Sequence, residues 1–446
     1  MHRAVRIFGL VVILLGIAIH LAELINGRFW LHDLQVYIGA AGSLLKGEPL
    51  YGISHGLDSG IFKYSPLMAL LFVPHALLPH TLAASIHFWC IIIAFIMAVL
   101  LADRIIREHL LPGSRMHVTP LLITALITVV HLHRELHLGN INIILLCVLL
   151  FSLHHALKGH WPLAGILLGM AVIAKPHFLL IIPLLIMRTS WRYLGFTLLT
   201  VAAGLVLPAL VMGWERNFNE HLEWFRQMSM HNASLIHIQG TGHEAVNTIY
   251  TFIHRVFLSP FMEAHARLPY FILSLIAFLF ALLVLRHMRR ERDRGEQGHF
   301  ILEYLILIAL VPNLTLTDTQ HFILSLPLVL WLMHRLRTQW NPILLIPAIL
   351  IFLGYGGNWE DALGPVSARM IDLGVLGISN ILLVLFVVYL SGQRTPGLPA
   401  KVPAPAEAAP FHSTSVDNGG LPHRKHAAMP DTFDHPRTRS TINAIG

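Results

Sequence analysis

The chain has 446 residues, of which 55% are hydrophobic and only 12% are charged. A soluble domain carries about 25% charged residues, so this chain has too little polar surface to face water on all sides. Its two cysteines, Cys90 and Cys147, lie in apolar stretches and fit neither a disulfide framework nor a zinc-ligand spacing. The net charge of +7 is spread over loops between apolar blocks, which indicates membrane topology and argues against nucleic-acid binding.

The apolar residues come in blocks that can cross a bilayer. A helix needs about 20 such residues to span the hydrocarbon, and backbone polar groups there must be bonded internally. The blocks lack two-residue alternation, which favours helices over barrel strands. We expect an all-α polytopic membrane protein with about twelve spans, at residues 5–25, 82–102, 119–132, 138–156, 161–174, 177–187, 193–212, 269–286, 300–316, 320–334, 342–354 and 374–391.

The distribution of charge predicts the orientation. We assume that residues 64–79 dip into the membrane without crossing it. One side then has 16 Lys and Arg and six Asp and Glu, and the other side has ten Lys and Arg and 14 Asp and Glu. An excess of Lys and Arg marks the cytoplasmic side. Residues 1–391 should then form one transmembrane domain, with long outer loops at 26–81 and 213–268. The tail, 392–446, is rich in Pro, Ala, Ser and His and should be disordered and cytoplasmic.

The first outer loop opens with the pattern of an amphipathic helix. Helical spacing places six residues on one face: Asp33, Val36, Tyr37, Ala40, Ala41 and Leu44. Such a helix is typical of a membrane surface, where a carboxylate on the apolar face is costly without a partner or a task. Asp33 is therefore either a helix N-cap, a position that aspartate favours, or a catalytic group.

Short motifs follow one another along the chain: Asp33 with Tyr37, Gly47-Glu48-Pro49-Leu50-Tyr51, Phe62-Lys63-Tyr64-Ser65-Pro66, Gly139-Asn140-Ile141-Asn142, Gly165 to Gly169 with Lys175-Pro176, and Asn232-Ala233-Ser234-Leu235. Their order resembles glycosyltransferase family 87, the polyprenyl-phosphate-mannose-dependent mannosyltransferases of the GT-C superfamily. The resemblance runs from about residue 33 to about residue 390. Ser65-Pro66 departs from the family's pair of prolines, and the element from Asp318 to Phe322 matches only loosely.

The resemblance implies a GT-C-type bundle that moves a hexose, usually mannose, from a polyprenyl-phosphate donor to a lipid or glycan hydroxyl. The site should lie on the outer, periplasmic face of the cytoplasmic membrane. Superfamily members use an aspartate of the first outer loop as the base, and Asp33 occupies that position. Direct attack on the anomeric carbon needs one carboxylate and inverts the configuration. The resemblance assigns acceptor or sugar binding to Tyr37, Tyr64, Asn140, Asn142 and Asn232.

The departing phosphate requires positive groups. Lys175 is the first candidate, because it ends a span beside a proline that breaks the helix. A lysine in this place can also simply extend its ammonium to the interface. Arg134, in an expected outer loop of residues 131–135, is the second candidate, and a salt bridge to Glu135 is its alternative.

His321 begins a span beside Asp318 and is a candidate to assist the phosphate or a proton transfer, although histidines at span ends are often only interfacial. His133 and His137 have i, i+4 spacing, but the residues between them do not complete a zinc-protease motif. We therefore expect no metal and no cofactor. The sequence has no Asp-x-Asp element, which argues against a sugar-nucleotide donor.

Two other interpretations stay open. A transporter or lipid-sugar flippase would place ionisable groups near the membrane midplane and often has internal repeats, which are not evident here. A structural membrane protein without chemistry would have little use for the long first loop. For the transferase, the partners are a polyprenyl-phosphate sugar, a lipid or glycan acceptor and membrane lipids.

Overall fold

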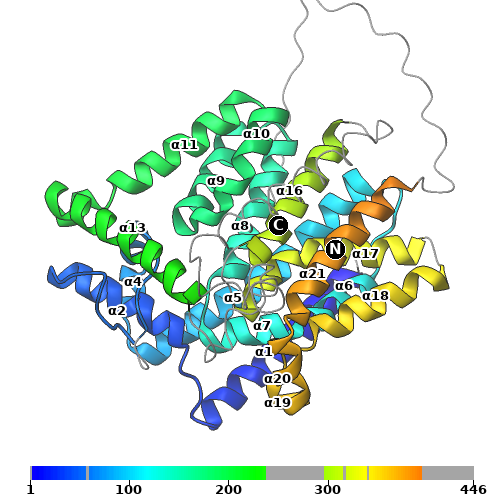
Figure 1. The fold of residues 1–446 in the computed structure, drawn as a ribbon, viewed down its shortest axis with the longest axis horizontal. Coiled ribbons are helices and arrows are strands. Elements are labelled where there is room, and N and C mark those ends of the chain that lie inside the picture. Colours follow the sequence, from blue (N-terminus) through cyan, green and yellow to red (C-terminus); the bar gives the residue numbers. More distant parts are fainter. Residues whose placement is uncertain (1–2, 57–59, 238–295, 315–317, 339–340, 394–446) are drawn as a thin grey trace, which may run out of the picture. The chain divides into compact units, whose positions relative to one another are not determined.

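The computed structural model describes residues 3–56, 60–237, 296–314, 318–338 and 341–393 (Figure 1). These residues form helices joined by turns, with one isolated β-bridge among them, between Ser54 and Ile61. The all-α prediction is therefore confirmed for this part of the chain. The helices are α1 Arg3–Ile25, α2 His32–Lys46, α3 Pro66–Leu71, α4 Val73–Ala76, α5 His80–Ile105, α6 Val118–Ile127, α7 Val129–Leu138, α8 Asn142–Leu157, α9 Trp161–Ala174, α10 Ile182–Arg188, α11 Trp191–Val206, α12 Ala209–Met212, α13 Trp214–His237, α16 Glu296–Leu314, α17 Leu326–Thr338, α18 Pro342–Tyr355, α19 Glu360–Leu363, α20 Pro365–Asp372 and α21 Val375–Gly392.

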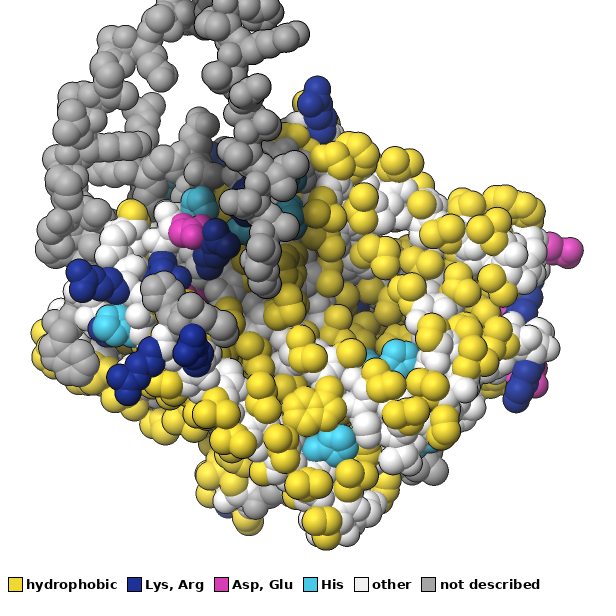
Figure 2. Space-filling view, turned by 180° about the vertical axis from the view of Figure 1, so that it is seen from behind, with side chains coloured by type: hydrophobic (Ala, Val, Ile, Leu, Met, Phe, Trp, Pro, Cys, Tyr) yellow, Lys and Arg dark blue, Asp and Glu magenta, His cyan; other side chains and the backbone are white. Residues whose placement is uncertain are grey.

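Four helical stretches are long and apolar enough to cross a membrane: α1, α5 with the π-helical turn Ile106–Leu110, α11 with α12, and α21. The pair α6 and α7 makes a fifth if it is one bent span. The other apolar helices, such as α8 and α9, are shorter, and residues 269–286 lie outside the described residues. Figure 2 shows a face of the molecule covered largely by apolar side chains, as lipid contact requires. The chain is a multi-pass membrane protein, but the expected number of twelve spans is not confirmed.

Residues 64–79 contain α3 and α4, which have six and four residues and are too short to cross the hydrocarbon. They pack against α2, whose buried side contains the fully buried Leu34, Ala40 and Ala41. The apolar face expected for α2 is thus largely confirmed. However, protein covers this face, whereas the sequence pattern indicated a membrane surface.

The segment expected to be one span at 119–132 is broken. α6 and α7 meet at Thr128 with a bend of 60°. The Thr128 hydroxyl donates to the carbonyl of Thr124 at 2.9 Å, a local bond that competes with the regular helical pattern and bends helices. Residues 131–135, expected as a loop, are therefore part of helix α7, which turns away from the axis of α6.

The glycine-rich helix α9 lies against α11, its neighbour in Figure 1. A Cβ added to Gly165 would lie 2.5 Å from Cβ of Phe196, and one added to Gly169 would lie 2.5 Å from Cβ of Thr200. Only glycine permits such a close approach of two helices, which is a common packing mode in membranes. The tight pair of α9 and α11 fixes the end of α9, where Lys175 follows.

The two segments that were predicted to be long outer loops contact each other. The carboxylate of Glu220 on α13 accepts from the backbone N–H of Leu50 at 3.2 Å, and Oε1 of Gln227 accepts from that of Gly52 at 3.0 Å. Arg216 forms an ion pair of 3.6 Å with Glu220 and donates to backbone carbonyls near the end of α2. Residues 213–237, the described part of the second of these segments, therefore pack on the segment that carries Asp33.

Candidate active site

Asp33 lies in the first turn of α2. The helix begins after Leu31, whose φ of 44° lies in the left-handed region that leucine rarely adopts. No side-chain hydrogen bond caps this end, and Asp33 is the second helical residue, so the N-cap alternative is wrong. Instead, Oδ2 of Asp33 accepts a hydrogen bond of 2.5 Å from Nδ2 of Asn140.

Gly139 makes this contact possible. Its φ of 68° suits glycine, and a Cβ at this position would lie 2.9 Å from Cβ of Leu31 and 3.0 Å from Cβ of Leu34. On its other side, its carbonyl accepts a hydrogen bond of 2.9 Å from Nε2 of His87 on α5. The turn between α7 and α8 is thus held between α5 and α2, which brings Asn140 to Asp33.

Backbone donors determine the orientation of the two asparagine amides. The N–H of Ile141 can only donate, so the atom of Asn140 that it meets at 2.7 Å is the carbonyl Oδ1. Nδ2 of Asn140 is then the atom that faces Asp33. Asn142 donates its Nδ2 to the same Oδ1 at 3.0 Å, which directs its own Oδ1 toward Lys175.

Lys175 extends this series of hydrogen bonds. It is an extended residue between the end of α9 and a 3₁₀ helix, Pro176–Ile181. Its Nζ donates to Oδ1 of Asn142 at 2.5 Å and to Nε2 of His321, at the 3₁₀ helix Thr319–Ser325, at 3.0 Å. An ammonium has three protons, so one is left for a ligand. Nε2 of His321 accepts here, so it is not available as a donor to a phosphate.

The surroundings of Asp33 combine burial with positive charge. Burial raises the pKa of Asp33 above its usual value, while the hydrogen bond from Asn140 and the charges of Lys175, Lys63 and Arg134 act in the opposite direction. A carboxylate with a raised pKa is a better base once it is ionised. The three cations also favour an anionic ligand close to Asp33. Lys63 was not among the residues predicted for the site.

Tyr37 and Tyr64, from the segment of residues 26–81, join the same site. Their hydroxyls are 3.0 Å apart and their rings meet edge to face. Nζ of Lys175 lies 5.6 Å from the centre of the Tyr64 ring, within the range of a cation–π contact. Burial raises the pKa of both phenols, so both hydroxyls stay protonated. One of them donates to the other, and the second keeps its proton for a ligand.

Glu135, like Lys63, was not among the residues predicted for the site. It is fully buried; its Oε1 accepts from the N–H of Ile143 at 2.9 Å and its Oε2 accepts from Nδ2 of Asn142 at 2.9 Å. Among the described residues it forms no ion pair with Arg134, which is exposed. Recognising residues 129–138 as a helix would have placed Glu135 on one face with the buried His131.

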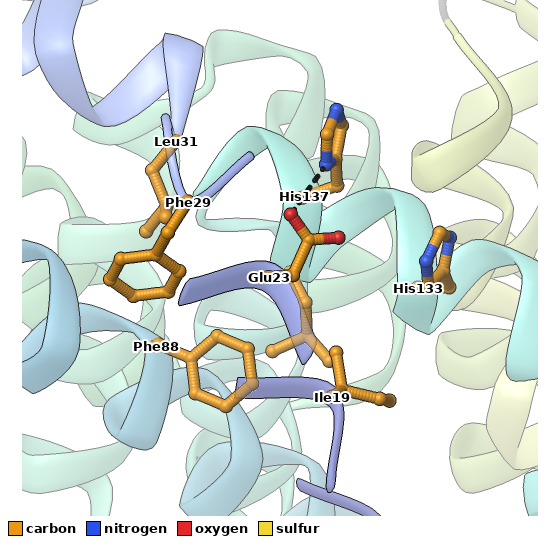
Figure 3. Close-up of a pocket in the computed structure, with 8 residues that line it drawn as sticks. Ile19, Glu23, Phe29, Leu31, Phe88, His133 and His137 are labelled. Atoms are coloured by element: carbon orange, nitrogen blue, oxygen red, sulfur yellow. Dashed lines mark ion pairs between the residues drawn. The ribbon is translucent and has the colours of Figure 1, made fainter. Parts of the chain in front are cut away.

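Two further predictions concern residues beside this network. Asn232 lies on helix α13, but its side chain is outside the described residues. His133 and His137 line a small hollow with Glu23 and Phe88 (Figure 3), and Nδ1 of His137 lies 3.5 Å from Oε2 of Glu23. Neither Asp33 nor Lys175 lines this hollow. The described residues include no group of three or more metal-type ligands.

The structure therefore brings most of the predicted residues together. Asp33, Asn140, Asn142, Lys175 and His321 form one continuous hydrogen-bonded network, and the two tyrosines contact it. Arg134 contributes charge without a direct bond to Asp33.

Known proteins match this chain at several levels. The model of glycosyltransferase family 87 matches residues 62–312, more than half of the chain. An alpha-(1->3)-arabinofuranosyltransferase of Corynebacterium glutamicum is 27% identical over 168 residues, which cover 38% of this chain and 40% of that protein. The match thus spans less than half the length of this relative.

Two solved structures of ArnT from Cupriavidus metallidurans are also similar over 85% of this chain and 77% of theirs. One is bound to undecaprenyl phosphate, with a TM-score of 0.34 and 11% identity, and the other is the apo state, with a TM-score of 0.33 and 10% identity. This likeness is distant. The extent of the family match is decisive: the chain is a membrane-embedded glycosyltransferase that belongs to glycosyltransferase family 87.

Proposed function

We propose that this glycosyltransferase moves a hexose, mannose in the first instance, from a polyprenyl phosphate to a hydroxyl of a lipid or glycan on the outer face of the cytoplasmic membrane. One observation carries the proposal. A partly buried carboxylate, Asp33, and an ammonium with a proton to spare, Lys175, belong to one hydrogen-bonded network. Transfer from a lipid phosphate requires both kinds of group.

The chemistry follows a single displacement. The ionised Asp33 accepts the proton of the acceptor hydroxyl while the acceptor oxygen attacks the anomeric carbon. The bond from that carbon to the phosphate oxygen breaks, and its electron pair leaves with the polyprenyl phosphate. Lys175 stabilises the charge that develops on this phosphate, with Lys63 and Arg134 adding positive potential. One carboxylate suffices, and the configuration at the anomeric carbon inverts.

Tyr37 and Tyr64 are proposed to hydrogen-bond sugar or acceptor hydroxyls as a pair, in which one phenol donates to the other and the second donates to the ligand. We propose that Asn140 and Asn142 orient the charged groups from behind rather than contact the sugar, because their amides are already bonded to protein. This differs from the sugar-binding role that the motifs implied.

A second candidate sugar has support of its own, since the matched relative is named as an arabinofuranosyltransferase. The same carboxylate and ammonium could serve a pentofuranosyl donor without any change in mechanism. A transporter or flippase has less support, because the chain belongs to a family of transferases.

The test uses the purified full-length chain in lipid nanodiscs. Radiolabelled polyprenyl-phosphate-mannose and polyprenyl-phosphate-arabinofuranose are each supplied with a lipid extract of the cell envelope as acceptor. We expect labelled product of inverted anomeric configuration from one of the two donors. The matched control is Asp33→Asn, which keeps the size of the side chain and removes the base.

Three outcomes contradict parts of the proposal. Transfer that survives in Asp33→Asn removes Asp33 as the base. A product with retained configuration removes the single displacement. Labelled donor that crosses the bilayer without forming a new glycosidic bond supports the flippase instead.

A further inference from the structure

A fully buried carboxylate at the active site has no assigned task. Glu135 on α7 is 0% exposed, and both of its oxygens are occupied by donors. Isolated buried charges are costly, so such a group needs a counter-charge or a set of donors. Here the donors are the N–H of Ile143 and the amide of Asn142, which in turn bonds Lys175.

The direction of each hydrogen bond leaves this cluster a single arrangement. The N–H of Ile143 can only donate, so it occupies one carboxylate oxygen permanently. The other oxygen accepts from Nδ2 of Asn142, and this forces Oδ1 of Asn142 to the opposite side, where Nζ of Lys175 meets it. Nδ2 of Asn142 also donates to Oδ1 of Asn140, so Glu135 and Asn140 together decide which end of the Asn142 amide the ammonium encounters.

We propose that Glu135 is a positioning residue for the transfer: with Asn140 it fixes the orientation of Asn142 and thereby directs Lys175 at the donor phosphate. The proposal rests on the proposed function for the identity of that phosphate. Glu135 itself does not touch the donor, because both of its oxygens face protein donors.

The decisive substitution is Glu135→Gln, which preserves size and shape. The glutamine must keep its carbonyl toward the N–H of Ile143, so its amide nitrogen faces Nδ2 of Asn142 and two donors meet. If Asn142 rotates to relieve this clash, it presents Nδ2 to the ammonium of Lys175, which repels it, and Oδ1 to Oδ1 of Asn140. If it does not rotate, the clash between the two donors remains, so the bond network that holds Lys175 is disturbed in either case. We expect the KM for the lipid donor to rise by about 10–100-fold, the range seen when groups that orient a ligand from behind are removed, with a smaller change in kcat.

A second substitution separates this role from a structural one. In Glu135→Gln combined with Asn142→Asp, the new carboxylate accepts from the glutamine and from Lys175 at once. We expect the double variant to recover part of the lost donor affinity, because the carboxylate at position 142 satisfies the glutamine and Lys175 but loses the bond to Oδ1 of Asn140. Asn142→Asp alone places two carboxylates together and should be impaired. Glu108→Gln, which alters an exposed pair with Arg104, is the matched control and should leave the donor KM unchanged.

A readout that needs no transfer completes the test. Acylation of Lys175 by acetic anhydride, followed by mass spectrometry across a pH series, reports how strongly its ammonium form is stabilised, with the exposed Lys158 as internal reference. In Glu135→Gln the midpoint of Lys175 labelling should move to lower pH, because the ammonium loses an acceptor and a nearby negative charge.

The outcomes separate this inference from the proposed function. If the wild-type chain transfers no sugar, the proposed function fails and the labelling midpoint still tests Glu135. If Glu135→Gln keeps both the wild-type donor KM and the wild-type midpoint, the inference is overturned. It is also overturned if activity falls while the midpoint stays fixed and the double variant shows no recovery, since a purely structural role gives that result.

Discussion

Two carboxylates lie near opposite ends of α5 and differ in their partners. Asp103 belongs to α5 itself, is fully buried, and accepts bonds of 2.8 Å from both Arg107 and His334. Asp33 lies against the turn that His87 of α5 holds, and His87 and Asp103 are about 24 Å apart along the helix. Among the described residues Asp33 makes no direct ion pair and bonds only a neutral amide.

The difference shows how one fold uses charge for two purposes. At Asp103 the opposite charges are in contact, so the cluster is satisfied and ties α5 to α17. Near Asp33 two amides separate the carboxylate from the ammonium of Lys175, so neither charge neutralises the other by contact. The first cluster stabilises the bundle, and the second keeps a base and a cation available to a substrate.

The largest expected effect is on catalysis, at the cluster that contains Asp33. Asp33→Asn should lower the transfer rate by about 10²–10⁴-fold, the usual contribution of a positioned general base. The thermal unfolding temperature should stay close to that of the wild type, because the side chain keeps its size. Rate measurements with labelled donor and a thermal unfolding scan check both statements. A large loss of stability in this variant would break the comparison between the two clusters.

The second substitution is at the cluster of Asp103, Arg107 and His334, where we expect an effect on stability. Asp103→Asn leaves Arg107 and His334 without their buried partner, and we expect a loss of about 3 kcal/mol in the free energy of unfolding. The turnover number per folded molecule should change little. Denaturant unfolding in detergent measures the first quantity, with Glu108→Gln, in an exposed pair, as the control. Equal losses in both variants would count against the assignment of Asp103 to structure.

A third substitution tests the role of the Lys175 ammonium. Lys175→Ala removes the ammonium that is proposed to face the phosphate, and we expect donor affinity to fall by about 10–100-fold, as for loss of a charged hydrogen bond. Binding of undecaprenyl phosphate to the purified protein measures it. Lys158→Ala, at an exposed lysine away from the network, is the control. Unchanged affinity in Lys175→Ala would remove its phosphate role.

The smallest expected effect is a shift in pH dependence. The base must be ionised, so activity is present above the pKa of Asp33 and is lost as the pH falls through it. The bond from Asn140 lowers this pKa, so Asn140→Ala should raise it and move the acidic limb of the pH–rate profile upward by up to about one pH unit. Gln35→Ala, on the same helix, should leave the limb in place. A shift toward lower pH would contradict the interpretation of the bond.

Much of the site was predictable because short motifs carry most of its residues. The order of Asp33, Tyr37, Tyr64, Asn140, Asn142 and Lys175 in the sequence was enough to propose that they share one site. The all-helical class and the multi-pass character followed from composition and from the length of the apolar blocks.

The other features of the fold and of the site could not be predicted, because they depend on local side-chain bonds or on contacts between distant segments. The bend at Thr128 arises from one side-chain bond within a continuous apolar run, which hydropathy does not detect. Without this bend, residues 131–135 were expected as a loop and Glu135 as a partner of Arg134. The strained backbone of Leu31 and its fit against Gly139 likewise depend on residues more than 100 positions apart.

The start of α8 has a consequence for how such an enzyme can diversify. The first N–H groups of any helix need acceptors from outside the helix. In α8 these acceptors are Oδ1 of Asn140, for Ile141, and the carboxylate of Glu135, for Ile143. Since the same atoms serve helix initiation and the active site, they are under two selective constraints at once. We expect variants adapted to a new sugar to change first at positions such as Tyr37 and Tyr64, whose side chains take no part in helix initiation.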